Sequence, residues 1–325
     1  MADAPRRVFL TGASGFIGRA LADRYRAEGW EVRGVDLAAD PARGVVAGDV
    51  TEPGDWQEHA QGCELVIHLA AWVGATGTHD RLWPINVRAT RLALDAAARA
   101  GARRFVHTSS IVTFGNDFPD GVDETYPVRP TGMPYTDTKI ASEQVVLAAQ
   151  LRGEVPCTII RPGDVYGPRS RPWVVLILEA IRRRQFLLPA RGRSIFSPVY
   201  VDNLVDGYVL AAESDAAAGE TFTITDGVGV ECREFFAHHH RWIGAAGPRG
   251  APTPVAAALA GTAAAAQRLA GRDPEVNLHA VRYLSRTATY SIAKARAVLG
   301  YEPAVGLDEG LERTRAWAEA EGLLA

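Results

Sequence analysis

The segment TGASGFIG at residues 11–18 restricts the fold more than any other stretch, because it joins a short apolar strand, RVFL, to an amphipathic helix that ends near Gly29. A glycine-rich loop between a strand and a helix is typical of dinucleotide-binding domains. Gly12 permits the tight turn, Gly15 lets the backbone approach a pyrophosphate, and Gly18 lets the helix pack closely on the sheet. N–H groups at the start of that helix would then face the anion.

Short apolar strands alternate with longer helical patterns through the first half of the chain. The strand patterns are RVFLT, EVRGVD, ELVIHLAA, RFVHTSS and CTIIRP, and a helical pattern runs over residues 86–100. Repeated strand–helix–strand units are typical of a parallel sheet covered on both faces, and nearly continuous apolar runs fit its central strands. The sequence therefore predicts an α/β fold with a Rossmann-type doubly wound parallel sheet.

The regular alternation stops after Arg161, where proline and glycine repeatedly interrupt the pattern. We expect residues 1–161 to form the dinucleotide-binding Rossmann domain, with returning segments at about 199–228 that contain VYVDNLVDGYVLAAE and TFTIT. Residues 162–198 and 229–325 are expected to form a smaller, mostly helical lobe that binds the substrate.

Composition argues against several other classes of protein. A formal net charge of −3 gives no general attraction to nucleic acid or to an anionic membrane surface. The three cysteines, Cys63, Cys157 and Cys232, are widely spaced, so we expect no disulfide framework and no metal site, and a reducing cytoplasm fits best. The N-terminus lacks the pattern of a secretory signal, and the alanine-rich stretch Ala251 to Gly271 is too weakly apolar for a membrane span.

A carboxylate ends the second predicted strand. Asp36 lies about 20 residues beyond the glycine loop, where it can accept hydrogen bonds from both hydroxyls of an adenosine ribose and would repel the 2′-phosphate of NADP. No arginine follows Asp36 directly, although Arg43 could fold back toward it. Alternatively, Asp36 could simply cap the end of the strand without binding a ribose. NAD is the expected cofactor, in preference to NADP.

Tyr135 and Lys139 lie four residues apart in PYTDTK, at the start of a predicted helix, and therefore share one face. A free phenol has a pKa of about 10, and a nearby ammonium favours its ionised form. Ser110 ends the strand RFVHTSS, at the edge of the sheet where doubly wound folds bind ligands. Such a Tyr–Lys pair also occurs by chance on many helices, so its interpretation as a catalytic centre depends on the glycine loop, Asp36 and Ser110.

Together these features resemble the extended short-chain dehydrogenase/reductase family over nearly the whole chain. GDV at 48–50 is similar to the family's adenine-contacting segment, HLAA at 68–71 to its motif on the fourth strand, and INVRAT at 85–90 to its asparagine-containing helix. RPGDVYGP at 161–168 resembles the segment that leaves the sheet past the nicotinamide. The resemblance implies that NAD is bound by Gly12, Ser14, Gly15, Phe16, Ile17, Gly18, Asp36, Asp49, Val50, Leu69, Ala70, Ala71, Asn86, Thr108, Tyr135, Lys139 and Pro162.

The resemblance also assigns roles at the chemical centre. Tyr135 is the expected acid/base, Lys139 its electrostatic partner and ribose ligand, and Ser110 the ligand of the substrate oxygen. Ser109 is the alternative to Ser110. Ser110 is preferred because TSSIVTFG is similar to the family's S-x-x-x-[YF]-G ending.

Two further expectations come from the resemblance alone. Asn86 would brace the strands around the site. A homodimer is implied, in which helices near 83–100 and 136–151 pack across a two-fold axis.

Several substrate contacts of nucleotide-sugar enzymes in this family are replaced by apolar residues. Val73 stands where UDP-galactose 4-epimerases carry a lysine, Phe196 where they carry a diphosphate-binding arginine, and residues 111–112, Ile–Val, where 4,6-dehydratases carry an Asp–Glu pair. Arg191 and Arg193 lie close enough in sequence to substitute for that arginine. An apolar pocket favours a bulky alcohol or ketone, although each apolar residue alone could equally belong to the core. The expected pocket residues are Trp72, Val73, Val112, Phe114, Asp164 and Phe196.

Two segments are most similar to the 3β-hydroxysteroid dehydrogenase branch of the family. They are residues 198–213, PVYVDNLVDGYVLAAE, and residues 281–314, which contain the predicted helices KARAVLG and LDEGLERT. HHHR at 238–241 is expected on a solvated helical face and not at a metal site, since consecutive imidazoles point in different directions.

The resulting hypothesis is an NAD-dependent oxidoreductase that transfers a hydride between nicotinamide and a bulky, apolar, hydroxysteroid-like alcohol or ketone. The alternative is a nucleotide-sugar epimerase with tightly bound NAD. A third possibility, from another class, is a non-catalytic dinucleotide-sensing protein.

Overall fold

The structure is a computed structural model that describes residues 5–74, 76–269, 271 and 278–325. Residues 1–4, part of the segment examined for a secretory signal, and residue 270 of the alanine-rich stretch lie outside these ranges. The strands are β1 (Arg7–Thr11), β2 (Glu31–Asp36), β3 (Val45–Ala47), β4 (Leu65–His68), β5 (Arg104–Thr108), β6 (Cys157–Pro162), β7 (Asp164–Tyr166), β8 (Leu187–Leu188), β9 (Ile195–Phe196), β10 (Pro198–Tyr200), β11 (Thr221–Ile224), β12 (Val230–Glu231) and β13 (Arg249–Gly250).

The α-helices are α1 (Phe16–Ala27), α2 (His79–Trp83), α3 (Ala89–Ala100), α4 (Pro134–Leu151), α5 (Leu176–Arg182), α6 (Val201–Glu213), α7 (Cys232–Trp242), α8 (Thr253–Leu269), α9 (Leu278–Tyr283), α10 (Ala293–Leu299) and α11 (Leu307–Ala320). The shorter 3₁₀ and π-helical turns are η1 (Pro41–Arg43), η2 (Asp55–Ala60), η3 (Pro84–Arg88), η4 (Ile111–Phe114), η5 (Arg171–Val175), η6 (Pro189–Gly192) and η7 (Asp215–Ala217).

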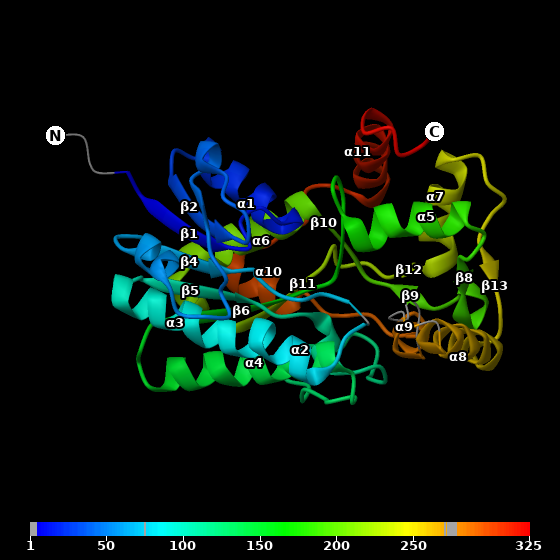
Figure 1. The fold of residues 1–325 in the computed structure, drawn as a ribbon, viewed down its shortest axis with the longest axis horizontal. Coiled ribbons are helices and arrows are strands. Elements are labelled where there is room, and N and C mark those ends of the chain that lie inside the picture. Colours follow the sequence, from blue (N-terminus) through cyan, green and yellow to red (C-terminus); the bar gives the residue numbers. More distant parts are fainter. Residues whose placement is uncertain (1–4, 75, 270, 272–277) are drawn as a thin grey trace.

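The central sheet confirms the predicted fold class. Its seven strands run parallel in the order β11-β6-β5-β4-β1-β2-β3. Figure 1 shows this sheet in one half of the molecule and a second lobe, which contains α5, α7 and α8, in the other half. Because the chain order reverses between β1 and β4, the loops after these strands open a crevice at the carboxyl edge of the sheet.

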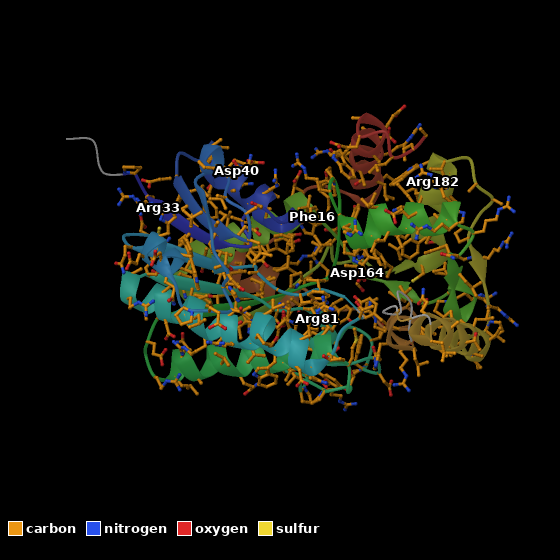
Figure 2. The ribbon with its side chains drawn as sticks, viewed as in Figure 1. Phe16, Arg33, Asp40, Arg81, Asp164 and Arg182 are labelled. Carbon is orange, nitrogen blue, oxygen red and sulfur yellow. The ribbon has the colours of Figure 1, made fainter. Side chains whose placement is uncertain are left out.

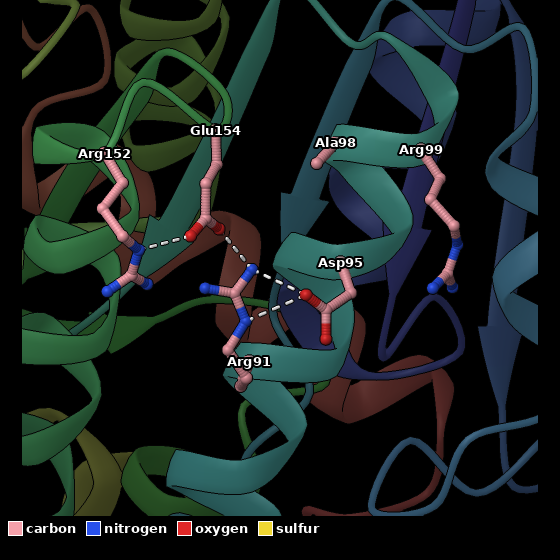
Figure 3. Close-up of a pocket in the computed structure, with 6 residues that line it drawn as sticks. All are labelled: Arg91, Asp95, Ala98, Arg99, Arg152 and Glu154. Carbon is pink, nitrogen blue, oxygen red and sulfur yellow. Dashed lines mark hydrogen bonds and ion pairs between the residues drawn. The ribbon is translucent and has the colours of Figure 1, made fainter.

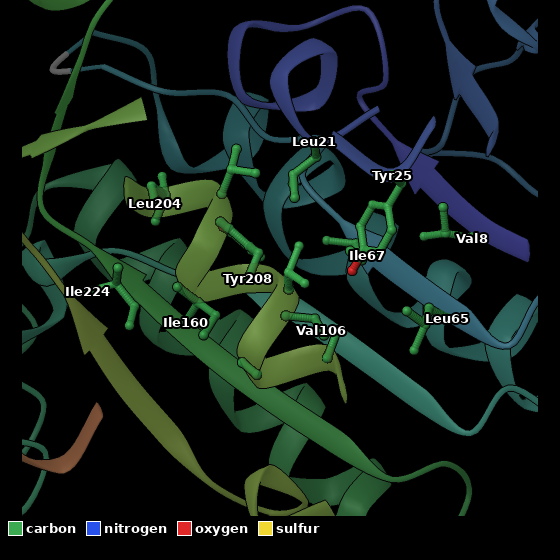
Figure 4. Packing of buried hydrophobic residues seen from close by; sticks show 14 of the residues in the cluster. Val8, Leu21, Tyr25, Leu65, Ile67, Val106, Ile160, Leu204, Tyr208 and Ile224 are labelled. Atoms are coloured by element: carbon green, nitrogen blue, oxygen red, sulfur yellow. The ribbon is translucent and has the colours of Figure 1, made fainter. Parts of the chain in front are cut away.

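Residues alternate between the two faces of the sheet, and each face is covered by helices. In β1, Val8 and Leu10 belong to the core under α1 and α6, whereas Phe9 belongs to the core under α3 and α4. Figure 4 shows the first of these cores, in which Tyr25 of α1 and Tyr208 of α6 pack against the strands. Both faces are therefore buried, as the apolar strand sequences predict.

The first core also includes part of the C-terminal region. Ala295 and Leu299 of α10, together with Tyr301, are buried in the same cluster as α6 and β11. The sequence placed these residues in the substrate lobe because they follow residue 229. In the structure this segment covers the edge of the Rossmann sheet, while the division of the remaining chain into lobes stays a prediction.

The second lobe has an aromatic core, and two of the consecutive histidines join it. Phe196 stacks on Phe235 with a centroid distance of 4.2 Å, and Phe235 meets His239, which is fully buried. His240 is also buried. The prediction of a solvated HHHR face was therefore wrong for His239 and His240, because the aromatic residues of α7 place this side of the helix inside the lobe, whereas Arg241 is exposed.

Strand ends differ from the sequence patterns in a way that positions the site. β4 ends at His68 and β5 at Thr108, so residues 69–71 and 109–110 lie in loops at the carboxyl edge.

The π-helical turn η3 precedes α3, and α8 falls within the alanine-rich stretch. None of the described helices is long and apolar enough to cross a membrane.

Candidate active site

The glycine loop directly follows β1, and its geometry leaves no room for side chains at two positions. Gly12 has a φ of +69°, and a Cβ atom there would lie 2.9 Å from the backbone nitrogen of Ala70. A Cβ atom at Gly18 would overlap the carbonyl oxygen of Gly12. Gly15 directly precedes α1 as its N-cap residue, and no described side chain caps the start of that helix. The loop can therefore bring backbone N–H groups close to a phosphate, and these residues fit a dinucleotide.

Asp36 lies at the end of β2, next to the glycine loop. Its Oδ2 accepts a hydrogen bond from the N–H of Ser14 at 2.9 Å, and its Oδ1 accepts one from the N–H of Leu37 at 2.8 Å. Arg43 does not fold back onto Asp36 but pairs with Asp23 at 2.5 Å. The carboxylate is thus held in place, with lone pairs left for ribose hydroxyls.

The other predicted cofactor residues lie at or shortly after the carboxyl ends of the strands that form this crevice. Asp49 is exposed, and hydrogen bonds from the N–H and hydroxyl of Thr51 lower the pKa of its carboxyl group. Val50 is buried in the core under α3. The N–H groups of Leu69 and Ala70 both donate to the hydroxyl of Thr11. Sequence reasoning did not identify Thr11 as part of this site. Phe16 and Ile17 lie in the first turn of α1, Ala71 lies after β4, and Pro162 is the last residue of β6.

Tyr135, Lys139 and Ser110 come together at the carboxyl edge of β5. The hydroxyl of Ser110 lies near that of Tyr135 and acts to lower the pKa of the phenol, and Ser110 also caps η4 by accepting from the N–H of Val112 at 3.3 Å. The ammonium of Lys139 donates to the carbonyl oxygen of Thr108 at 2.7 Å. A serine hydroxyl, a phenol and an ammonium thus lie together at a single strand end.

Burial changes the acid–base properties of this group. It raises the pKa of Tyr135 to about 12, against a smaller lowering by the hydrogen bond to Ser110. It lowers the pKa of Lys139 to about 8, while the carboxylate of Glu143 raises it. Both changes favour the neutral form of each side chain, so a nearby charge is needed to ionise the phenol.

The two candidate serines have different surroundings. Ser109 is buried, and its hydroxyl donates to Oε1 of Glu143 at 2.5 Å. Ser110 is the serine that acts on the phenol of Tyr135, lowering its pKa. This geometry favours Ser110 as the substrate ligand. Glu143 was missed, although its position four residues after Lys139 could have drawn attention to it.

Asn86 joins the loop after β4 to α4. Its side-chain oxygen accepts from the N–H of Trp72 at 2.8 Å, and its amide nitrogen donates to the carbonyl of Trp72 at 3.2 Å and to the hydroxyl of Thr138 at 3.0 Å. The side chain therefore fixes the loop after β4 against the helix that carries Tyr135, whereas the expected bracing of the strands by Asn86 stays a prediction.

The apolar pocket candidates fall into two groups, and one of these groups surrounds Tyr135. Val112 and Tyr135 share a buried cluster with Leu82 and Met133, and Trp72 packs against it. Tyr283, from the second lobe, also packs against this cluster and was missed by sequence reasoning. Val73, which follows Trp72, is 61% exposed and is not part of this cluster.

The other three pocket candidates are placed differently from the prediction. Phe114 and Phe196 are fully buried in separate aromatic clusters, so neither lines an open cleft. Asp164 is also buried: its oxygens accept from the hydroxyl of Tyr283, from the N–H of Ser197 and from Arg286 at 3.3 Å. The expectation that Asp164 faces the substrate is corrected, because partners distant in sequence occupy its carboxylate.

Asp164 marks the boundary between the two lobes. Figure 2 shows it there, with Phe16 of the glycine loop and Arg81 of α2 along the same boundary. The catalytic candidates and the second lobe therefore meet where the sheet ends.

An open pocket of about 520 Å³ lies elsewhere, on α3 and the end of α4. In Figure 3, Arg91 pairs with Asp95 and Glu154, and Glu154 also pairs with Arg152. Its lining is mostly charged and does not include Tyr135. Because both carboxylates of the lining are already paired with arginines, we assign it no function. Within the described ranges, no group of three or more His, Cys, Asp or Glu side chains gathers as a metal site would.

A parallel sheet of this strand order, with a glycine loop after β1 and a Ser–Tyr–Lys group after β5, defines a dinucleotide-dependent enzyme fold. A family model described as the NAD dependent epimerase/dehydratase family matches residues 8–225. The chain belongs to this family and is an extended short-chain dehydrogenase/reductase.

Curated relatives and solved structures extend this finding. The chain is 32% identical to 4-hydroxy-2-methyl-3-oxo-4-farnesyl-3,4-dihydroquinoline-1-oxide ketoreductase of Stigmatella aurantiaca, over 95% of this chain and 96% of that protein. It is 33% identical to 3-beta-hydroxysteroid dehydrogenase of Mycolicibacterium neoaurum, over 91% and 87% of the two chains. The structure of MoeE5 in complex with UDP-glucuronic acid and NAD matches with a TM-score of 0.77 and 26% identity, over 97% and 99% of the two chains.

Proposed function

We propose that this protein is an NAD-dependent oxidoreductase that interconverts a bulky, apolar secondary alcohol and the corresponding ketone. The observation that carries the proposal is the placement of Tyr135 near the hydroxyl of Ser110 and inside an apolar cluster with Val112 and Trp72. A reacting hydroxyl or carbonyl could bind to this pair while its apolar body contacts the cluster.

Each residue of the pair has a distinct task. Bound NAD supplies the hydride acceptor, and its reduced form supplies the donor. Ser110 donates or accepts a hydrogen bond at the substrate oxygen and orients it. Tyr135 removes the hydroxyl proton during oxidation and returns it during reduction. Lys139 lowers the cost of the phenolate by its positive charge and can hold a ribose hydroxyl.

The relatives support an apolar substrate. The ketoreductase acts, by its name, on a farnesyl-substituted dihydroquinoline oxide, and the other relative is a hydroxysteroid dehydrogenase. Trp72 and Tyr283 present aromatic surface beside Tyr135, which suits a large ring system. The similarity to MoeE5, whose structure contains a nucleotide sugar, keeps a nucleotide-sugar epimerase as the second candidate.

A substrate screen separates the two candidates. Reduction of NAD would be followed by absorbance with hydroxysteroids, cyclic and aryl alcohols, and UDP- or dTDP-sugars. Turnover with an apolar alcohol supports the proposal. If the protein is purified with stoichiometric NAD, oxidises none of the alcohols and interconverts a nucleotide sugar, the epimerase is favoured instead.

We propose the preference for NAD over NADP on the basis of Asp36. Removal of the Asp36 carboxylate should weaken that preference. Ser14 connects Asp36 to a cation, because its N–H donates to Asp36 and its carbonyl accepts from Arg19 at 2.9 Å. In Asp36→Ala we expect kcat/KM with NADP to rise relative to NAD by about tenfold or more, since the repelling carboxylate is gone and Arg19 remains. An unchanged ratio of the two kcat/KM values would show that Asp36 does not select the cofactor.

A homodimer and a cytoplasmic location remain expectations from the sequence. Sedimentation equilibrium of the purified chain would test the first, with a mass near twice 34.9 kDa expected for the dimer. Localisation of the tagged protein in its native cell would test the second.

A further inference from the structure

One face of α4 carries three buried ionisable side chains at intervals of four residues: Tyr135, Lys139 and Glu143. Residues with this spacing lie one above another on a helix. Glu143 thus extends the Tyr–Lys row by one turn, away from the Ser110–Tyr135 pair. Nothing in the proposed reaction yet uses it.

The carboxylate of Glu143 is fixed from two sides. Arg161 of β6 donates to Oε1 at 2.9 Å and to Oε2 at 2.8 Å, and Ser109 donates to Oε1. The two side chains of the ion pair are 2% and 6% exposed. The guanidinium also lies over the ring of Phe114 at 4.7 Å. Since both carboxylate oxygens are held, the negative charge stays at one place relative to Lys139.

Lys139 is a buried cation with several titratable neighbours. Burial lowers the pKa of His68 to about 3 and that of His107 well below its ordinary value, so both are neutral. Tyr208 donates to the hydroxyl of Thr108 and is neutral, because burial raises its pKa. The titratable groups around Lys139 are Glu143 of α4, His68 of β4, His107 of β5 and, across Thr108, Tyr208 of α6. Tyr135 lies one helical turn before Lys139 on α4, and Arg161 of β6 is paired with Glu143. In this set the negative charge comes from Glu143.

We propose that Glu143 is a positioning residue for catalysis: its carboxylate, fixed by Arg161 and Ser109, keeps the ammonium of Lys139 charged inside the protein. The inference rests on the role proposed above for Lys139. It makes the buried Glu143–Arg161 pair part of the working site and not only a link between α4 and β6. Burial brings the pKa of Lys139 down to about 8, so the loss of Glu143 would leave much of this lysine neutral at physiological pH.

The sequence makes a direct measurement feasible. Of the 35 lysine and arginine residues, only Lys139 and Lys294 are lysines. Protein labelled with ¹³C-lysine should therefore give two sets of ε-carbon signals. Lys294 lies on α10, where it pairs with Glu220 at 2.7 Å, so it serves as the internal reference. The NMR titration of Lys139 needs neither NAD nor a substrate.

Two variants break the same ion pair with opposite changes of charge. Glu143→Gln removes the attractive carboxylate, so we expect the pKa of Lys139 to fall by about one unit. Arg161→Gln leaves the carboxylate uncompensated, so we expect that pKa to rise. In an active enzyme, the alkaline limb of the pH profile of kcat/KM should move in the same two directions.

A pair with a merely structural role would behave differently. In that case Glu143→Gln and Arg161→Gln would both leave the pKa of Lys139 unchanged or would shift it in the same direction. Either result overturns the proposal. If the single variants do not fold, Glu143→Gln/Arg161→Gln decides the question, since it leaves no unpaired charge in the interior. In this double variant we expect the pKa of Lys139 to lie below the wild-type value. An unchanged pKa contradicts the proposal. Failure of the substrate screen would leave this NMR result unaffected, so the two hypotheses fail separately.

Discussion

Replacement of Tyr135 by phenylalanine should lower kcat by about 10²- to 10⁴-fold, the usual contribution of a positioned acid/base group. The change removes the hydroxyl that lies near Ser110 and that would carry the proton, while the ring keeps its place in the cluster with Val112 and Met133. Steady-state kinetics with the best alcohol from the screen would measure the loss. Binding of NAD, followed by calorimetry, should change little.

A matched control is available elsewhere in the chain. Tyr25 is fully buried against Trp30, and its hydroxyl has no hydrogen-bond partner among the described residues. Tyr25→Phe should therefore keep wild-type turnover. If Tyr135→Phe also retained full turnover, Tyr135 would not be the acid/base and the proposed mechanism would be wrong.

Replacement of Asp164 by asparagine should destabilise the fold by about 3–5 kcal/mol, the typical cost of leaving one partner of a buried ion pair without the other. The side chains of Asp164 and Arg286 are 1% and 2% exposed, and Arg286 cannot lose its charge by titration. Urea denaturation followed by circular dichroism would measure the change in the free energy of unfolding.

An exposed pair of similar geometry provides the comparison. Glu52 accepts two hydrogen bonds from Arg88, at 2.7 and 2.8 Å, but these side chains are 61% and 48% exposed. Because solvent screens such pairs, Glu52→Gln should cost less than about 1 kcal/mol. If Asp164→Asn and Glu52→Gln lost equal amounts of unfolding free energy, burial would not be what makes the Asp164–Arg286 pair costly to break.

The parts of the site that follow local rules could be predicted from the sequence. The glycine loop is fixed by its position between a strand and a helix, and the Tyr135–Lys139 pair by helical spacing. β6 and β11 were recognisable as apolar runs. These features depend on residues near one another in the chain, so a single sequence contains their pattern.

Contacts between distant segments could not be predicted in the same way. Phe196 is apolar whether it lines a pocket or fills a core, and its partners, Phe235 and Phe236, lie about forty positions away. Asp164 looked available for a substrate because Tyr283 and Arg286, which bind it, are 119 and 122 residues distant. Burial and pairing of this kind become visible only when the chain is folded.

The position of α10 has a consequence for biosynthesis. Ala295, Leu299 and Tyr301 complete the apolar core that covers one face of the dinucleotide-binding sheet. Until the ribosome has added residues 293–301, the part of this core beside β11 and α6 is open to water, and Tyr283, which packs beside Tyr135, is made only shortly before them. The nascent chain therefore cannot complete either its first core or its active site until these residues have been synthesised.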